Sequence, residues 1–241
     1  MSKRLKRLLH PYRLLNKAST EIAVRLGMLR RVTPIGRSFG MDRGGPVDRY
    51  YIDSFIAQHQ SDVRGVVLEA GGFTSYTKRF GGGRVTRGEV LYPKPGFPDG
   101  TLVGDLVSGS GIPEEAFDCL ILTQVFPFIY ELPAAAATCY RALKPGGVLL
   151  ATLPGISQIC AYDRDQWGDY WRFTDSAARR LFGDAFGPDH VTVQAHGNVL
   201  TACAFLHGLS RADLTVAELD HHDPAFQLTV TVRATKASRL G

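Results

Sequence analysis

Three acidic residues follow short apolar runs at regular intervals in the middle of the chain. Glu69 closes the run "GVVLEA", Glu89 comes 20 residues later after "GRVTRG", and Asp105 follows "TLVG". Ligands of an open parallel sheet lie beyond the carboxyl ends of its strands, so these acids are expected to face one crevice. An acid in the place of Glu89 can accept hydrogen bonds from the hydroxyls of an adenosine ribose. Asp105 can accept from the exocyclic amine of a purine, and the backbone amide of Leu106 can donate to a ring nitrogen. Alternatively, each acid binds no ligand and is simply a solvated residue at a strand end or the cap of a helix.

A glycine pair, Gly71 and Gly72, follows Glu69, as in loops that cradle a nucleotide. Phe73 and Ser75 stand where the next two glycines of such a loop are expected. Glycine is required where φ is positive or where the backbone touches a ligand, so Phe73 predicts a changed loop path. The sequence leaves open whether the Phe73 ring borders the ligand or fills its place.

The elements that would position these residues alternate from Val66 onward between short apolar runs and helical segments. This pattern predicts a parallel sheet buried on both faces. Helices are predicted from Pro46, over residues 131–143, and behind an N-cap at Thr174. Residues 226–234 alternate strictly between apolar and polar types, which predicts an antiparallel strand at a sheet edge with one wetter face.

Length and composition indicate a globular α/β domain. The chain has 241 residues, 44% hydrophobic and 21% charged. Four cysteines show neither a CxxC pair nor metal spacing, so we expect reduced thiols and a cytoplasmic location. His221 and His222 are adjacent, and side chains adjacent on an extended chain point to opposite sides. No metal site is therefore predicted.

Positive charge is concentrated at the start of the chain. Residues 1–31 carry nine Lys or Arg and one acid, whereas the whole chain has a net charge of +5, so the remainder is slightly acidic. We therefore predict a basic helical arm over 1–45 and one domain over 46–241, with no nucleic-acid partner. Residues 1–31 have a basic amphipathic pattern, which fits packing on the domain or peripheral contact with an anionic membrane.

Several motifs in a fixed order resemble the class I S-adenosylmethionine-dependent methyltransferases of the type 11 group. The order is "VVLEAGG", the acid Glu89, "GDL" at 104–106, "FDCLILTQVF" with its leading Phe-Asp pair, and "LKPGGVLLATLPG". The "F-D, apolar strand, L-K-P-G-G" order is the most specific part. The resemblance covers residues 66–236.

This resemblance implies a Rossmann-like fold with a seven-stranded, mostly parallel sheet, an antiparallel last strand and helices on both faces. It implies S-adenosyl-L-methionine as cofactor. The residues implied to bind it are Glu69, Gly71, Gly72, Glu89, Asp105, Leu106, Thr123 and Gln124. The segment "RGGPVDRYYIDSF" is similar to one that precedes the core in bacterial relatives, and implies that Arg43, Arg49, Tyr50 and Tyr51 lie near the cofactor carboxylate or form a lid.

Acceptor-side chemistry is expected from the loop after the fifth strand, "GISQICAYDRDQWGDYWRF". A hydroxyl acceptor needs a general base within hydrogen-bond reach, and Asp163 and Asp169 are the candidates. Aromatic rings beside acids and an arginine suit a sugar or polyol, so the substrate-binding candidates are Tyr162, Tyr170, Trp171 and Arg172. These residues could equally cap turns and pack the loop.

The predicted function is therefore methyl transfer from S-adenosylmethionine, at oxygen, to a small molecule or glycan precursor. The alternative is a non-catalytic protein of the same fold that docks on a partner or a membrane. An NAD-dependent oxidoreductase ranks lower because a complete G-x-G-x-x-G is missing. Oligomeric state is not indicated by the sequence.

Overall fold

The computed structural model describes residues 30–71 and 75–238. Contacts divide the chain into one unit of residues 1–34 and a larger unit of residues 35–241. Most of the predicted arm lies outside the described residues, as do Gly72 and Phe73. Residues 35–45 belong to the larger unit, where the amides of Ile35 and Gly36 donate to the carbonyl of His207 at 3.0 and 2.9 Å.

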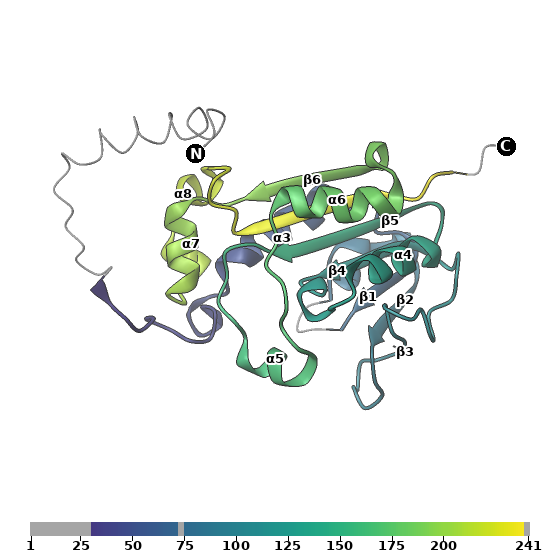
Figure 1. The fold of residues 1–241 in the computed structure, drawn as a ribbon, viewed down its shortest axis with the longest axis horizontal. Coiled ribbons are helices and arrows are strands. Elements are labelled where there is room, and N and C mark those ends of the chain that lie inside the picture. Colours follow the sequence, from purple (N-terminus) through teal and green to yellow (C-terminus); the bar gives the residue numbers. More distant parts are fainter. Residues whose placement is uncertain (1–29, 72–74, 239–241) are drawn as a thin grey trace, which may run out of the picture. The chain divides into compact units, whose positions relative to one another are not determined.

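One seven-stranded sheet organises the larger unit, with the strand order β3-β2-β1-β4-β5-β7-β6 (Figure 1). The strands are β1 (Gly65–Ala70), β2 (Val85–Tyr92), β3 (Leu102–Val103), β4 (Phe117–Thr123), β5 (Leu143–Pro154), β6 (Val191–His196) and β7 (Thr229–Thr235). Neighbours from β3 to β5 pair in parallel, whereas β7 is antiparallel to both β5 and β6. The predicted sheet, with its antiparallel last strand, is confirmed.

Helices cover both faces of the sheet. α3 (Val47–Gln58) lies on one face, and α4 (Leu132–Ala142) and α6 (Asp175–Phe186) lie on the other (Figure 1). α5 (Ala161–Trp167) follows the carboxyl end of β5, while α7 (Val199–Leu206) and α8 (Val216–Asp220) precede β7. No helix among the described residues is long and apolar enough to cross a membrane.

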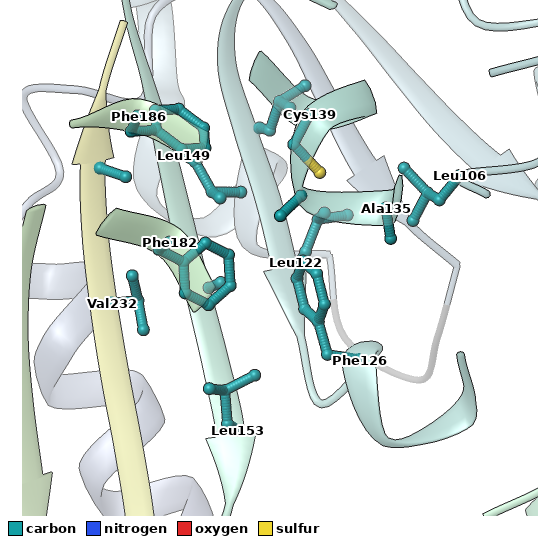
Figure 2. Packing of buried hydrophobic residues seen from close by; sticks show 14 of the residues in the cluster. Leu106, Leu122, Phe126, Ala135, Cys139, Leu149, Leu153, Phe182, Phe186 and Val232 are labelled. Carbon is teal, nitrogen blue, oxygen red and sulfur yellow. The ribbon is translucent and has the colours of Figure 1, made fainter. Parts of the chain in front are cut away.

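Strand side chains alternate between two apolar cores because successive residues point to opposite faces. Leu68 faces the α4 and α6 side, and its neighbour Val67 faces α3. Figure 2 shows the first core, where Phe182 of α6 lies near Val232 of β7 and Leu153 of β5. The second core joins α3 to β1, β4 and β5.

Local signals set the helix ends. The Thr174 hydroxyl accepts a hydrogen bond from the amide of Ala177 at 3.2 Å, which confirms the predicted N-cap of α6. α4 ends at Ala142, directly before the "LKPGG" segment in which Pro145 prevents further helix. Pro46 is the N-cap of α3 rather than a residue of its first turn.

The expectation that residues 226–234 form an edge strand with a wetter face is wrong. β7 lies between β5 and β6, and nearly all of its residues are buried. Two polar residues of its pattern have partners inside the fold: the Thr231 hydroxyl donates to the Gln194 carbonyl at 3.2 Å, and Arg233 pairs with Asp62 at 2.8 Å. The buried hydroxyl of Thr229 has no hydrogen-bond partner among the described residues. Thr231 fits a buried strand because its hydroxyl has a cross-strand partner.

Candidate functional site

Glu69 is buried at the carboxyl end of β1. Its carboxylate accepts hydrogen bonds from the Ser75 hydroxyl at 3.2 Å and from the amides of Tyr76 and Thr77 at 2.8 and 2.9 Å. Free amides at the start of a helical turn favour a carboxylate in this position. Glu69 therefore holds together the turn that follows β1.

Gly71 follows β1 and lies against Tyr92, the last residue of β2. A Cβ atom built on Gly71 would lie 1.9 Å from the Tyr92 ring, so only glycine fits beneath it. The ring stacks on Phe97 with centroids 3.9 Å apart, and the Tyr92 hydroxyl donates to Asp99 at 3.0 Å. The group that approaches the Gly71 backbone is therefore a side chain of the protein itself.

Glu89 lies inside β2, three residues before the strand ends at Tyr92, so its predicted place at the strand end is wrong. The reason is that β2 continues through Val90, Leu91 and Tyr92 beside β1 and β3. The Glu89 carboxylate contacts Arg87 at 3.2 Å and accepts from the Thr101 hydroxyl. Glu89 and Glu69 line one cavity of about 320 Å³, together with Ser75 and Thr77 of the turn that begins at Ser75.

Asp105 and Leu106 follow the two-residue strand β3. The Asp105 carboxylate accepts from the Val107 amide at 2.8 Å and from the Ser108 hydroxyl at 2.9 Å. These hydrogen bonds, first of all that from Val107, outweigh desolvation and lower the pKa of Asp105. Leu106 is buried in the core near Ala135 (Figure 2). The pair thus stabilises its own turn in the described conformation.

A second cavity, of about 370 Å³, lies beyond the carboxyl ends of β4 and β5. It brings together five of the predicted site residues, from β4 and from the loop after β5: Gln124, Tyr162, Asp163, Asp169 and Arg172. Gln124 has a left-handed φ of 58°, which turns the chain at the end of β4, and its amide donates to the Thr152 carbonyl at 2.9 Å. Thr123, one residue earlier, is the last residue of β4 and pairs with Thr152.

Asp169 and Arg172 form a bidentate ion pair on the wall of this cavity. The two N···O distances are 2.5 and 3.0 Å, and only 2% of the Asp169 side chain is exposed. Arg172 also donates to the Gln158 carbonyl at 2.9 Å. Both Asp169 oxygens thus hold the guanidinium in place, and a role of Asp169 as general base stays a prediction.

Asp163 lies in the first turn of α5 and is half-buried. The pKa of the neighbouring Cys160 thiol is raised, first by burial and then by its hydrogen bond to Asp163. Two of the predicted substrate residues lie apart from the cavity lining: Tyr170 and Trp171 pack on Tyr130, with ring centroids 5.4 and 5.6 Å away.

Sequence reasoning missed Asp48, which lines the 370 Å³ cavity beside Arg49 on the first turn of α3. Asp48 Oδ1 is buried without a hydrogen-bond partner. Burial raises the pKa of Asp48 and outweighs the opposing effect of Arg49. The signal that could have found it is an acid directly after "GGPV", where a helix begins.

The other residues of that segment point elsewhere. Arg43 pairs with Asp213 at 2.9 Å. The Tyr50 hydroxyl donates to Asp220 at 2.7 Å, and the Tyr51 hydroxyl donates to the Leu219 carbonyl at 2.9 Å. Tyr50 and Tyr51 tie α3 to α8, and Arg43 ties the turn before α3 to Asp213. Of the four residues, Arg49 alone lines the cavity.

Comparisons with known proteins agree with this fold. A family model described as a methyltransferase domain matches residues 84–151. Malonyl-[acyl-carrier protein] O-methyltransferase of Serratia marcescens is 31% identical over 118 residues, which are 45% of this chain and 44% of that protein. The chain thus matches less than half the length of this relative.

Two solved structures share the fold at low sequence identity. A possible exported protein of Bordetella parapertussis has a TM-score of 0.51 and 16% identity, over 81% of this chain and 71% of that one. The N-methyltransferase NodS of Bradyrhizobium japonicum, in complex with S-adenosyl-L-homocysteine, has a TM-score of 0.50 and 12% identity, over 84% of this chain and 94% of that one.

Proposed function

We propose that this chain, whose fold and whose residues 84–151 are those of the class I methyltransferases of the type 11 group, is an S-adenosylmethionine-dependent methyltransferase. The observation that carries the proposal is the cavity of about 370 Å³ beyond β4 and β5. Its volume lies in the range of about 300–1,000 Å³ that small-molecule sites occupy. It also lies where open α/β sheets bind ligands, at the carboxyl ends of the strands.

Residues of this cavity would provide orientation and exclusion of water. S-adenosylmethionine, when bound, supplies an electrophilic methyl group, so alignment of the acceptor contributes most of the rate. Gln124 at the end of β4 would orient the reacting groups, and the Arg172 guanidinium, fixed by Asp169, would bind an anionic or hydroxyl part of the acceptor. Asp163 remains the candidate base for a hydroxyl acceptor.

We further propose oxygen as the methylated atom, on a small molecule or glycan precursor. Support comes from the relative of Serratia marcescens, which is an O-methyltransferase. Three acids and three arginines in the lining of one cavity also suit an acceptor that carries hydroxyl or carboxyl groups. The proposed location of the protein is the cytoplasm.

A second candidate function is favoured by the contact between Tyr92 and Gly71. In the described conformation the Tyr92 ring covers the backbone of Gly71, which the resemblance implies would approach the methionine part of the cofactor. The carboxylates of Glu69, Glu89 and Asp105 are likewise engaged within the fold. Binding of the cofactor would require the Tyr92 ring to turn aside. If the Tyr92 ring stays in place, the cofactor does not bind, and the protein would be a non-catalytic docking module.

Calorimetric titration with S-adenosyl-L-homocysteine separates these two functions. The methyltransferase proposal expects saturable heat at a one-to-one ratio. Absence of heat at high protein concentration, with folding confirmed by circular dichroism, would contradict it. Sedimentation with anionic vesicles, with and without residues 1–31, tests docking on a membrane, and salt-sensitive binding lost on truncation would support it.

A further inference from the structure

The loop between β2 and β3 contains a short strap, residues 94–99, that contacts the carboxyl end of α5. The Phe97 ring lies near the Trp167 ring, with centroids 5.8 Å apart. Lys94 Nζ lies 4.6 Å from the centroid of the same Trp167 ring and donates to the Gln166 side chain at 3.4 Å. An ammonium over an indole face is attracted by the quadrupole of the ring. The strap therefore holds α5 at its last turn.

The same strap holds Tyr92 at the end of β2. Phe97 stacks on the Tyr92 ring with centroids 3.9 Å apart and an interplanar angle of 1°. The Tyr92 hydroxyl donates to Asp99, also in the strap, at 3.0 Å. This is the ring that covers Gly71, where a built Cβ atom would lie 1.9 Å from it. One side chain, Phe97, thus contacts both the cover over Gly71 and the helix α5.

The other end of α5 belongs to the acceptor cavity. Tyr162 and Asp163 of its first turn line the 370 Å³ cavity, as does its N-cap residue Cys160. A helix of this length is a rod of about 10 Å, so a movement at Trp167 carries the first turn with it. The strap is therefore connected to both proposed binding regions, to Gly71 through Tyr92 and to the acceptor cavity through α5.

We propose that the strap couples the two regions, so that binding of the cofactor frees α5 in the wall of the acceptor cavity. When the Tyr92 ring turns aside for the cofactor, it leaves its stack on Phe97, and the strap loses its hold on Trp167. α5 then moves together with Asp163. Coupling between sites is reciprocal, so an acceptor that binds the freed form of α5 favours cofactor binding in turn. The inference rests on the proposed function and adds to it this regulation of its two sites.

The first test is the affinity of the full chain for S-adenosyl-L-homocysteine, measured by calorimetry. Phe97→Ala removes the stack that holds the Tyr92 ring, so a larger share of the protein is competent to bind. We expect binding about 3–10-fold tighter than in the wild type. Phe97→Tyr keeps an aromatic ring and should keep the wild-type affinity. Arg180→Ala changes an exposed residue of α6 and should also leave it unchanged.

The second test needs no ligand and follows α5 through the Cys160 thiol. Of the four cysteines, two are buried and Cys203 is half-buried, so a Cys203→Ser background leaves Cys160 as the accessible thiol. In that background Phe97→Ala and Lys94→Ala should each speed the labelling of Cys160 by a maleimide about 3–10-fold, because α5 loses its hold. Phe97→Tyr and Arg180→Ala should leave the rate unchanged.

The two tests decide the inference together. Unchanged or weaker binding of S-adenosyl-L-homocysteine by a folded Phe97→Ala protein would overturn it. Tighter binding with unchanged Cys160 labelling would also overturn it, since the strap would then act on Tyr92 without reaching α5. If neither the wild type nor the Phe97→Ala protein binds S-adenosyl-L-homocysteine, the proposed function itself fails. The coupling then fails with it, even where labelling shows that the strap holds α5.

Discussion

At the scale of single residues, the acids of this chain differ in what their carboxylates already hold. Glu69, Asp105 and Asp169 each accept hydrogen bonds from groups of the protein, whereas Asp48 leaves Oδ1 without a partner. Sequence position alone does not distinguish these cases, because every one of them lies next to a strand or helix end. The distinction comes from the groups that each carboxylate meets in space.

Asp169 should contribute to stability through Arg172. Asp169→Asn removes one charge of a nearly buried bidentate pair and is expected to lower the free energy of unfolding by about 1–3 kcal/mol. Asp165→Asn is the control, since Asp165 pairs with Arg164 on the exposed surface. This substitution should change the free energy of unfolding by about 0.5 kcal/mol or less. Urea denaturation measures both. Equal effects would show that the Asp169 pair is no stronger than a surface pair.

At the scale of elements, the contact between the ends of β1 and β2 constrains both strands. Gly71→Ala would place a methyl group against the Tyr92 ring and is expected to destabilise the fold by about 1–3 kcal/mol. The same change in a Tyr92→Ala background should have little effect, because the ring is gone. Tyr92→Phe keeps the ring and should keep the penalty. Additive effects of Gly71→Ala and Tyr92→Ala in urea denaturation would rule out this contact.

The β6–β7 pair carries a half-buried histidine, His196, that makes stability depend on pH. Burial, aided by His222, lowers the pKa of His196 to about 4 from its ordinary 6.5. Below about pH 6.5 the unfolded chain takes up a proton that the folded protein does not, so stability falls from about pH 6.5 to pH 4. His196→Gln should reduce this loss by about 1–3 kcal/mol, whereas the exposed His190→Gln should not. Identical pH profiles of unfolding for all three proteins would contradict the assignment.

At the scale of the whole molecule, ligand binding should appear as thermal stabilisation. S-adenosyl-L-homocysteine at about 100 times its dissociation constant would add about 2.7 kcal/mol, or about 5–10 °C in Tm for a chain of this size. NAD is the matched comparison, because the lower-ranked oxidoreductase function would require it. A shift with NAD and none with S-adenosyl-L-homocysteine, measured by calorimetric scanning, would reverse the ranking.

The fold was predictable because its signals are local. Apolar strands, the Thr174 cap and the "LKPGG" turn each act over a few residues, and together they predict the observed sheet. The arrangement of the candidate site was less predictable from the sequence. The Tyr92 ring over Gly71, the placement of β7 inside the sheet, and Asp48 beside the ends of β4 and β5 all depend on residues far apart in sequence. Gln124, Asp163 and Arg172 line the same cavity, and their roles stay predictions.

The place of β7 in the sheet has a consequence for biosynthesis. β6 pairs only with β7 among the described strands, and β7 follows α8 in the sequence. A nascent chain that has emerged only through α8 therefore exposes the open edge of β5 and leaves β6 without a partner strand. Sheet completion must await the emergence of β7 from the ribosome. Until then the unpaired edge of β5 can pair with strands of other chains, so we expect chaperones to bind the nascent chain at this stage.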